Sequence, residues 1–411
     1  MYKKEEISES NQQFIVIGMD DNQSQSFAPE VIEVIKDHQI FSGGRRHYEI
    51  VKDLLPREII WIDITVPLEH VFNEYTAHPI IVVFASGDPL FFGFANTIQR
   101  KLPKASIKLF PSFNSLQTLA HRLLMPYHNM KIVSLTGRPW HEFDKALIEH
   151  VDEIGVLTDG EHTPSTIAQR MADYGYSNYN IAIGEHLGNK EKERIYRLSI
   201  EETMTREFDR PNCMILKKVQ YSEKQVAERV RYFGIPDQLF EHLDGREKMI
   251  TKSSIRLLTL SALDLPNKTF FWDIGFCTGS ISIEAKLLFP HLHITSFEIR
   301  PEGQHLMEEN CHRFGAPGIT SVIGNFLNVS LSEYHCPDAV FIGGHGGQLG
   351  EIVKRVVSIL LPGGLIVFNS VSEGSRLQFI TAIQQEGLKQ LPPLHVAIND
   401  YNPIDILIAK K

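Results

Sequence analysis

Short apolar runs alternate with amphipathic segments through most of the sequence. Runs of strand length occupy 14–18, 80–85, 131–135, 154–158, 270–274, 293–298, 320–323, 338–342 and 365–369. Segments with helical spacing of apolar residues lie between them; in Ser280–Leu288, for example, Ile281 and Ala285 share a face. The alternation predicts an α/β fold. Because parallel strands need a crossover, usually a helix, the pattern from about residue 250 predicts a mostly parallel, doubly wound sheet. Ligands of such sheets bind at the carboxyl ends of the strands.

The chain is long enough for more than one domain. It has 411 residues, and a domain commonly holds about 150. The pattern changes near 208–222, where an apolar run after Pro211 gives way to polar residues. We therefore place a boundary at about 213–222, between an N-terminal domain of residues 1–212 and a C-terminal domain of residues 223–411.

Composition argues against several classes of function. Lys and Arg number 41 against 50 Asp and Glu, a net charge of −9, so we expect no nucleic-acid partner. The four cysteines form no C-x-x-C pair, which favours a reduced, cytoplasmic chain. The polar N-terminus and the short apolar runs predict neither a signal peptide nor a membrane span. His291 and His293 lack a third ligand, so no metal site is expected.

The sharpest local signal is Trp272–Ser280, which follows a predicted strand and opens a helix. Gly275 and Gly279 allow a tight turn and close approach of a ligand. The dinucleotide fingerprint G-x-G-x-x-G is not matched, because Cys277 stands at the second glycine and the third is absent. Glu298, at the end of the next predicted strand, can accept hydrogen bonds from both ribose hydroxyls of an adenosine. The loop favours S-adenosylmethionine over NAD; the alternative is a purely structural turn.

Two further segments follow the next predicted strands. Asn325 and Phe326 lie where such folds usually contact the adenine. Gly343 begins a stretch with four glycines in five residues, which allows the backbone to line a pocket above the cofactor. A mobile loop is the alternative. His345 in this stretch is a weak candidate for a general acid or base, and no other catalytic residue is assigned.

Four strings in the C-terminal half carry a family resemblance: Met249–Lys252, Asp273–Ser280, Phe297-Glu298 and Phe341–Gly344. With them, residues 245–350 closely resemble the decarboxylating domain of the precorrin-6Y C(5,15)-methyltransferases of cobalamin biosynthesis. The resemblance implies a Rossmann-like class I methyltransferase domain. It implies S-adenosylmethionine binding by Thr251, Asp273, Gly275, Gly279, Glu298, Asn325, Phe326 and Gly343. Thr251 is also expected to cap the helix that follows it.

Four strings in the N-terminal half resemble the tetrapyrrole methylases: Gly43–His47, Ala85–Gly93, Leu135–Pro139 and Leu157–Pro164. That class folds as two α/β lobes with S-adenosylmethionine between them. The resemblance implies cofactor contacts at Gly87, Asp88 and Ser115, with Gln117 in the same segment. An Asx turn is the alternative for Asp88, and a polar helix start for Ser115 and Gln117. The family's G-x-G-P-G loop is replaced here by Gly18–Gln23, whose backbone is less able to approach a ligand closely.

The resemblance implies methylation of carbons 5 and 15 of a reduced tetrapyrrole and loss of carbon dioxide from an acetate at carbon 12. The sulfonium methyl is already activated and the meso carbons are already nucleophilic. The protein therefore mainly has to align them and exclude water, without a triad or a metal cluster. Cys277 is not expected to act as a nucleophile, because methyl transfer needs none.

A polyacidic tetrapyrrole requires cationic side chains, and the arginine fork suits carboxylates. The predicted substrate-binding residues are Arg45, Arg46, His47 and Arg138 in the first domain, and Arg246 and Arg256, clustered with Lys248 and Lys252, in the second. A solvated surface charge is the alternative for each. The only partners expected are this small molecule and further copies of the chain, since related domains commonly self-associate.

Three other readings remain. A class I RNA or protein methyltransferase with an accessory domain would show a basic surface and an N-P-P-Y or D-P-P-Y motif, where this chain has Ile342–His345. An NAD-dependent oxidoreductase is disfavoured by the missing glycine. A tetrapyrrole-binding module without turnover is supported only by the altered 18–23 loop. Whether the substrate holds cobalt stays open.

Overall fold

The computed structural model describes residues 12–219, 232–244, 246, 249–399 and 402–411. By internal contacts the chain divides into two units. The first comprises the chain to Arg138 together with 152–169 and 178–219; the second comprises 139–151, 170–177 and the chain from 220 onward. The predicted boundary at 213–222 overlaps strand β10 (Asn212–Lys218), and its last residues, like the predicted domain start at 223, lie outside the described residues.

The first sheet is entirely parallel, with strand order β3-β2-β4-β1-β5. Its strands are β1 (Gln13–Met19), β2 (Ile40–Gly43), β3 (Ile60–Asp63), β4 (Ile80–Ser86) and β5 (Ser106–Phe110), and the connecting helices are α1 (Pro29–Asp37), α2 (Arg45–Val51), α3 (Glu69–Tyr75) and α4 (Phe94–Lys101). Successive side chains of β1 enter different apolar clusters: Phe14 belongs to one and Ile15 to the other. The central strands are therefore covered on both faces, as expected for parallel sheets.

The second sheet of this unit is mixed, with strand order β6-β7-β10-β8-β9. Only β6 and β7 pair in parallel. Its other strands are β6 (Lys131–Ser134), β7 (Glu153–Leu157), β8 (Tyr179–Glu185) and β9 (Arg194–Leu198), and its helices are α5 (Ser115–Leu123) and α8 (Ile200–Met204). The same stretch of chain forms α6 (His141–Ile148), which belongs to the second unit, and α7 (Pro164–Asp173), whose last residues do. Strands β8 and β9 form an antiparallel hairpin.

The C-terminal sheet has seven strands in the order β13-β12-β11-β14-β15-β17-β16. Five are parallel: β11 (Phe270–Ile274), β12 (His293–Glu298), β13 (Ile319–Ile323), β14 (Ala339–Ile342) and β15 (Leu365–Ser370). The last two, β16 (Lys389–Val396) and β17 (Ile404–Lys410), are antiparallel. This Rossmann-like topology agrees with the predicted fold class, although the final hairpin was not predicted.

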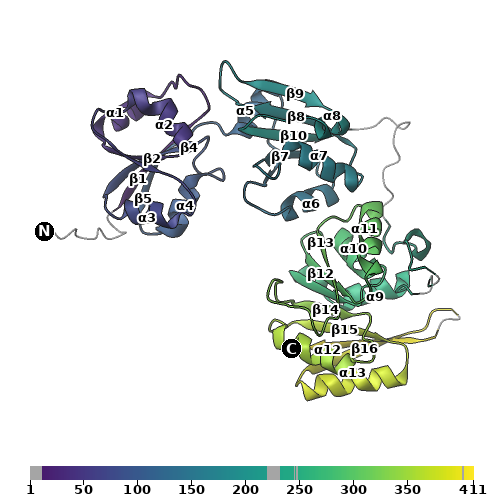
Figure 1. Cartoon of the computed structure of the whole chain (residues 1–411). Helices are drawn as coiled ribbons and strands as arrows, with labels where there is room; N and C mark the ends of the chain where they lie inside the picture. The colour runs from purple at the N-terminus through teal and green to yellow at the C-terminus, as the bar shows by residue number, and fades with distance from the viewer. Residues whose placement is uncertain (1–11, 220–231, 245, 247–248, 400–401) are drawn as a thin grey trace. The chain divides into compact units, whose positions relative to one another are not determined.

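Helices cover both faces of the C-terminal sheet (Figure 1). On one face lie α9 (Ser253–Ala262), α10 (Ser280–Leu288) and α11 (Glu302–Phe314), and on the other α12 (Leu349–Ile359) and α13 (Glu373–Gln385). Neighbouring residues of β11 point to opposite faces of the sheet. Phe271 packs with α9 and α10, and Trp272 packs with α12 and α13. This double cover leaves the carboxyl edge of the sheet for a ligand.

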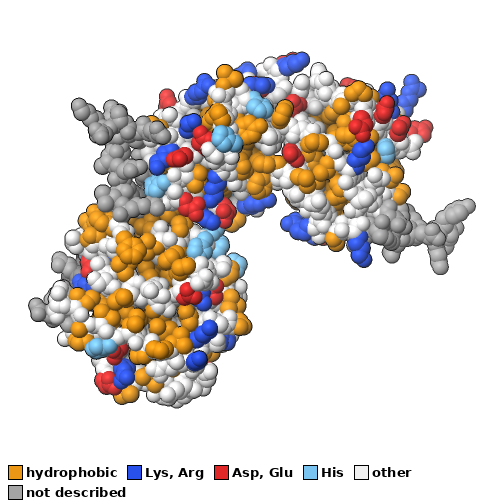
Figure 2. All heavy atoms as spheres, turned by 180° about the vertical axis from the view of Figure 1, so that it is seen from behind, with side chains coloured by type: hydrophobic (Ala, Val, Ile, Leu, Met, Phe, Trp, Pro, Cys, Tyr) orange, Lys and Arg blue, Asp and Glu red, His pale blue; other side chains and the backbone are white. Residues whose placement is uncertain are grey.

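Within the described ranges, no helix has the length and apolar character needed to cross a membrane. Acidic and basic side chains are interspersed over the face shown in Figure 2. That mixture does not resemble the single-sign basic field with which proteins bind nucleic acids.

Candidate functional site

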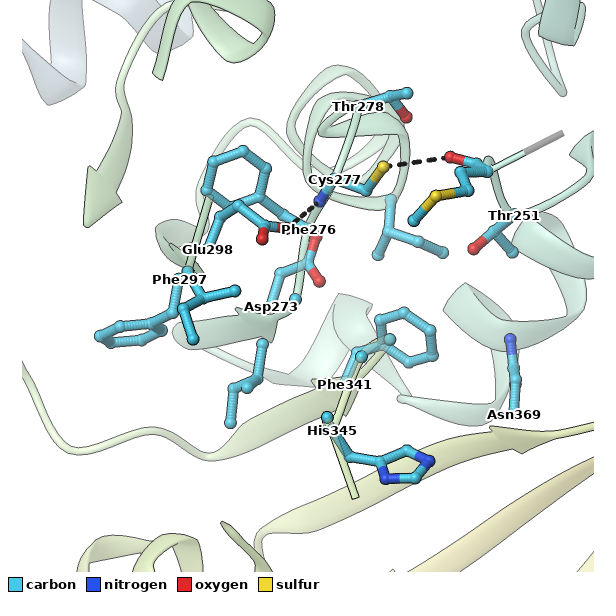
Figure 3. Close-up of a pocket in the computed structure, with 18 of the residues that line it drawn as sticks. Thr251, Asp273, Phe276, Cys277, Thr278, Phe297, Glu298, Phe341, His345 and Asn369 are labelled. Carbon is cyan, nitrogen blue, oxygen red and sulfur yellow. Dashed lines mark hydrogen bonds between the residues drawn. The ribbon is translucent and has the colours of Figure 1, made fainter. Parts of the chain in front are cut away.

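A pocket of about 420 Å³ lies at the carboxyl ends of β11, β12, β14 and β15 (Figure 3). Its lining brings together eight sequence-predicted residues: Thr251, Asp273, Gly275, Glu298, Asn325, Phe326, Gly343 and His345. Gly279 is not part of the lining. It is the N-cap residue of α10, with φ 74°, and a Cβ there would come 2.4 Å from the Met307 sulfur. Its role is thus to let the turn enter the helix.

Gly275 creates a close backbone approach at the floor of the pocket. Its φ is 78°, and a Cβ on it would meet the backbone nitrogen of Gly344 at 2.5 Å. Its own N–H donates to the carbonyl of Phe297 at 2.7 Å, which ties the turn to β12. Cys277 also has a left-handed φ, 52°, and its thiol donates to the Met249 carbonyl at 3.1 Å. A thiol engaged in this way supports the expectation that Cys277 is not a nucleophile.

Glu298 is 3% exposed, with both carboxylate oxygens held in place. Oε2 accepts from the Cys277 N–H at 2.9 Å, and Oε1 accepts from the backbone and side chain of Arg300 at 3.0 and 3.2 Å. Each carboxylate oxygen offers about two acceptor directions. Oε2 therefore keeps one direction for a ligand hydroxyl, whereas Arg300, a residue that the sequence reasoning missed, occupies those of Oε1.

Asp273, which lines the same pocket, has one buried oxygen without a hydrogen-bond partner among the described residues. Its Oδ2 accepts from the Ser282 hydroxyl at 2.6 Å, but its Oδ1 has no hydrogen-bond partner among the described residues, and the same holds for Thr278 Oγ1. Burial raises the pKa of Asp273 to about 7, and the charge of Glu298 adds to this effect. A cationic ligand group beside Oδ1 would satisfy that oxygen and favour the ionised form. The glycine floor, the carboxylate of Glu298 and this free oxygen fit the sulfonium nucleoside predicted from the sequence.

Asn369, at the end of β15, lines the pocket and was not predicted. Its Nδ2 donates to the hydroxyl of the buried Thr259 at 2.9 Å. It was missed because a single asparagine after an apolar run carries no motif. Only the pairing of β14 with β15, which sets Ile342 opposite Phe368, brings Asn369 beside the glycine loop.

Two sequence predictions near this pocket are wrong. Thr251 does not cap α9, because the N-cap residue is Lys252 and no side chain caps the helix. Arg256 is 0% exposed, so it cannot meet a substrate as predicted. It pairs with Glu284 at 2.5 Å and with Asp237 at 3.3 Å, and it donates to the carbonyls of Thr251 and Ile235. Arg256 thus anchors the segment that carries Thr251 to the pocket edge.

The other predicted cations of this unit differ in accessibility. Arg246 is exposed and lines a separate shallow pocket of mixed charge together with Arg300. Lys252 lies 3.6 Å from Asp237 and also lines the main pocket. Lys248 lies outside the described residues. Substrate binding by Arg246 and Lys252 stays a prediction.

In the N-terminal unit, Arg46 and His47 converge on Ser86, at the carboxyl ends of β2 and β4. Arg46 Nη2 donates to Ser86 Oγ at 2.7 Å, and His47 Nε2 lies 2.9 Å from the same oxygen. Arg46 also lies 3.4 Å from Asp21, whose other oxygen lies 3.0 Å from His186 Nδ1. Asp21 belongs to the 18–23 loop, so this loop contributes a carboxylate to the cluster.

His47 is held neutral. Burial, followed by the charge of Arg46, lowers its pKa to about 4. Its Nδ1 accepts from the Gly44 N–H at 3.2 Å, which leaves the proton on Nε2, facing Ser86. Arg45 is exposed beside it. Arg138 is exposed too, 5.1 Å from the ring centre of Phe92, and donates to Ser134 Oγ at 2.8 Å.

The predicted cofactor residues of this unit lie in tight local structure. Gly87 has φ 62°, and a Cβ on it would come 3.0 Å from Asn114 Cα, so the β4 loop and the start of α5 are adjacent. Asp88 Oδ1 accepts from the Leu90 N–H at 2.8 Å, an Asx turn. Ser115 begins α5, while Asn114 and Gln117 form its capping box. These contacts agree with the structural alternatives for Asp88 and Gln117 and leave cofactor binding at Gly87, Asp88 and Ser115 a prediction.

Comparison with known families finds one match in each half of the chain. The profile of the tetrapyrrole (corrin/porphyrin) methylases matches residues 14–203, and that of the precorrin methyltransferase domain matches residues 238–403.

Individual proteins similar to this chain carry related names. The chain is 31% identical over 364 residues to the precorrin-6Y C(5,15)-methyltransferase [decarboxylating] of Sinorhizobium sp, covering 87% of this chain and 84% of the relative. It is 31% identical over 168 residues to the cobalt-precorrin-6B C(15)-methyltransferase (decarboxylating) of Salmonella typhimurium, covering 41% and 85%. A crystal structure of precorrin-6y C5,15-methyltransferase from Geobacter metallireducens is 33% identical, covering 43% of this chain and 96% of that one, with a TM-score of 0.40. By its identity to the Sinorhizobium protein over most of both chains, this chain belongs to the precorrin-6Y C(5,15)-methyltransferase family.

Proposed function

We propose that this chain methylates carbons 5 and 15 of a precorrin-6-type tetrapyrrole with S-adenosylmethionine and removes the carboxyl group of the acetate at carbon 12. The observation that carries the proposal is the C-terminal pocket, where the buried Glu298 and the unpaired oxygen of Asp273 face a glycine floor. Family membership supplies the reaction class.

S-adenosylmethionine supplies an activated methyl group when it is bound. In the C-terminal pocket, Glu298 Oε2 accepts from a ribose hydroxyl. Asp273 Oδ1 accepts from the ammonium group, whose positive charge lowers the raised pKa of this carboxyl. Gly275 and Gly343 admit the ligand against the backbone, and the buried ring of Phe326 provides apolar surface for the base.

We divide the reaction between the two predicted domains. Residues 1–212 methylate carbon 5, and residues 223–411 methylate carbon 15 and decarboxylate. The shorter Salmonella relative supports this division, because its name joins C(15) methylation with decarboxylation and it corresponds in length to less than half of this chain. The precorrin methyltransferase profile over 238–403 is consistent with it.

The substrate is a small polyacidic molecule, so the half-exposed Arg46 and the exposed Arg45 and Arg138 bind its carboxylates in the N-terminal unit. All four cysteines are unpaired, which suits the reducing cytoplasm predicted for this chain. Self-association stays a prediction from the sequence.

The direct test incubates the full chain with a precorrin-6-type substrate, with and without cobalt, and methyl-labelled S-adenosylmethionine. We expect two methyl groups transferred and one carbon dioxide released per substrate. Asp88→Ala should lose one methyl transfer, and Glu298→Ala the other together with decarboxylation. Absence of methyl transfer to either form of the substrate contradicts the proposal, and intact chemistry in Glu298→Ala contradicts the C-terminal site.

A further inference from the structure

The side of the C-terminal pocket away from Glu298 carries a second set of polar groups. Figure 3 places Asn369 and Thr251 across the pocket from Glu298, with His345 at its lower edge. Neither Asn369 nor His345 is needed to hold the nucleoside. Both are partly exposed to the pocket, and they come from adjacent strands, β14 and β15, through the loop after Ile342 and the end of β15.

Asn369 is held in one orientation by Thr259. The Thr259 hydroxyl has two acceptors within reach, the Ile255 carbonyl at 2.8 Å and Asn369 Oδ1 at 3.3 Å. The shorter contact takes its single proton, so the hydroxyl accepts the Nδ2–H of Asn369 at 2.9 Å. Thr259 is fully buried, which makes this a rigid anchor. An amide nitrogen has two N–H bonds, and the second has no acceptor among the described residues. It remains free for a ligand in the pocket.

His345 is held as a neutral donor. Its Nδ1 accepts from the Gly347 N–H at 3.2 Å, so the ring proton lies on Nε2. Its ring packs edge-on against Phe368 at 5.8 Å between centroids. Partial burial lowers its pKa, which keeps the imidazole uncharged at neutral pH.

The surroundings of these donors contain no unpaired positive charge in the part of the chain that the structure describes. The cations that line the pocket are Lys252, 3.6 Å from Asp237, and Arg300, 3.2 Å from Glu298. The lining of the pocket also contains Gln348 and the apolar residues Ile255, Phe341, Ile352, Val371 and Ile404. A carboxylate placed here meets neutral N–H donors in a weakly solvating environment.

We propose that Asn369, oriented by Thr259, together with His345 binds the substrate carboxylate that is lost as carbon dioxide. This inference rests on the proposed function. In the step, the bond between the methylene and carboxyl carbons breaks and its electron pair enters the conjugated macrocycle. Carbon dioxide leaves, and a proton from water completes the new methyl group.

Neutral donors suit this reaction better than an arginine would. The negative charge leaves the carboxyl group as the bond breaks, so a group that stabilises the carboxylate strongly also raises the barrier. An amide and an imidazole orient the carboxylate without a full countercharge, and the apolar lining withholds water from it. The burial of Arg256 away from the pocket is consistent with this requirement.

The test measures carbon dioxide released from substrate labelled in its acetate carboxyls, methyl transfer to carbon 15, and affinity for S-adenosylhomocysteine by calorimetry. Asn369→Ala should slow decarboxylation about 10-fold or more, because the carboxylate is no longer held in a fixed orientation, with methyl transfer and affinity within about twofold. Asn369→Asp, of the same shape, should slow it further because it repels a carboxylate. Asn328→Ala, an exposed asparagine outside the pocket, is the control.

Thr259 is tested as a positioning residue. Thr259→Val should slow decarboxylation at unchanged affinity for S-adenosylhomocysteine, and Thr259→Ser should restore it, because serine keeps the hydroxyl. Normal carbon dioxide release by Asn369→Asp overturns the inference, as does an equal loss of methyl transfer, decarboxylation and donor affinity in Asn369→Ala. Failure of the unaltered chain to transfer any methyl overturns the proposed function itself.

Discussion

Arg46 and Arg256 make the same kind of ion pair in two different environments. Arg46 is 39% exposed beside Asp21, at the carboxyl ends of β2 and β4 in the N-terminal unit. Arg256 is 0% exposed beside Glu284, under the edge of the C-terminal pocket. In the sequence the two looked alike, and both were predicted to bind substrate. Only Arg46 retains access to a ligand.

The difference shows how each unit uses positive charge. In the N-terminal unit, cations stay at the surface, where they can meet carboxylates. In the C-terminal unit, the buried Arg256 holds the pocket wall, and the lining offers carboxylate oxygens and neutral N–H groups beside the ion-paired Lys252 and Arg300. One site is therefore suited to binding acidic groups by charge, and the other to binding a cationic donor and releasing carbon dioxide.

The largest expected effect separates these two arginines directly. Arg256→Met leaves Glu284 buried without its partner and should lower the free energy of unfolding of the C-terminal unit by about 3–5 kcal/mol. Arg46→Gln should cost less than about 1 kcal/mol, because half-exposed pairs contribute little. Urea denaturation of the full chain measures both. Arg256→Met/Glu284→Gln should recover most of the loss, and equal costs for the two single variants would refute the comparison.

Gly275→Val tests whether ligand binding in the C-terminal pocket requires a residue without a side chain at position 275. A side chain there collides with Gly344 and forces a left-handed φ on a branched residue. We expect affinity for S-adenosylhomocysteine at this site to fall by about 100-fold or more, roughly 3 kcal/mol. Gly363→Ala is the control, since Gly363 has φ 75° but open space around it, and calorimetry is the measurement. Retained affinity in Gly275→Val would place the ligand elsewhere.

Glu298→Gln measures how much of the affinity for S-adenosylhomocysteine comes from the carboxylate of Glu298. The amide keeps the shape but loses the charge, and we expect about 10-fold weaker binding of S-adenosylhomocysteine. The exposed Glu302→Gln should bind as the unaltered chain does. Unchanged affinity in Glu298→Gln would show that the two sites do not differ in their use of carboxylates.

The smallest effect is the pH dependence of the two units. His47 has its pKa lowered from 6.5 to about 4, so its stabilising contribution is complete above pH 6.5 and is lost as the pH falls toward 4. His47→Gln should remove about 1 kcal/mol of the destabilisation between pH 7 and pH 5. The pKa of Asp273 shifts in the opposite direction, from 3.8 to about 7. Ionisation of Asp273 therefore lowers the free energy of unfolding more and more as the pH rises from 3.8 to about 7. Parallel acid dependence in His47→Gln and the unaltered chain would refute this assignment.

Much of the architecture can be predicted from local patterns of residue types in the sequence. The alternation of apolar runs and helical segments predicted the strands of the C-terminal sheet through β15, and the glycine turn after Ile274 predicted the location of the pocket. Glu298 could be found because its distance from that turn reports the end of the next strand. These signals are local, and backbone geometry makes them independent of distant contacts.

Other features depended on which segments pack together. Neither the identity of Asn369 as a lining residue nor the burial of Arg256 can be read from neighbouring residues. Asn369 reaches the pocket through the pairing of β14 with β15, and Arg256 is buried because Glu284 on α10 faces α9. The sequence alone thus specifies the helices and strands and the glycine turn after Ile274. Tertiary packing decides which charges remain accessible, because solvent exposure is a property of the assembled layers and not of any segment alone.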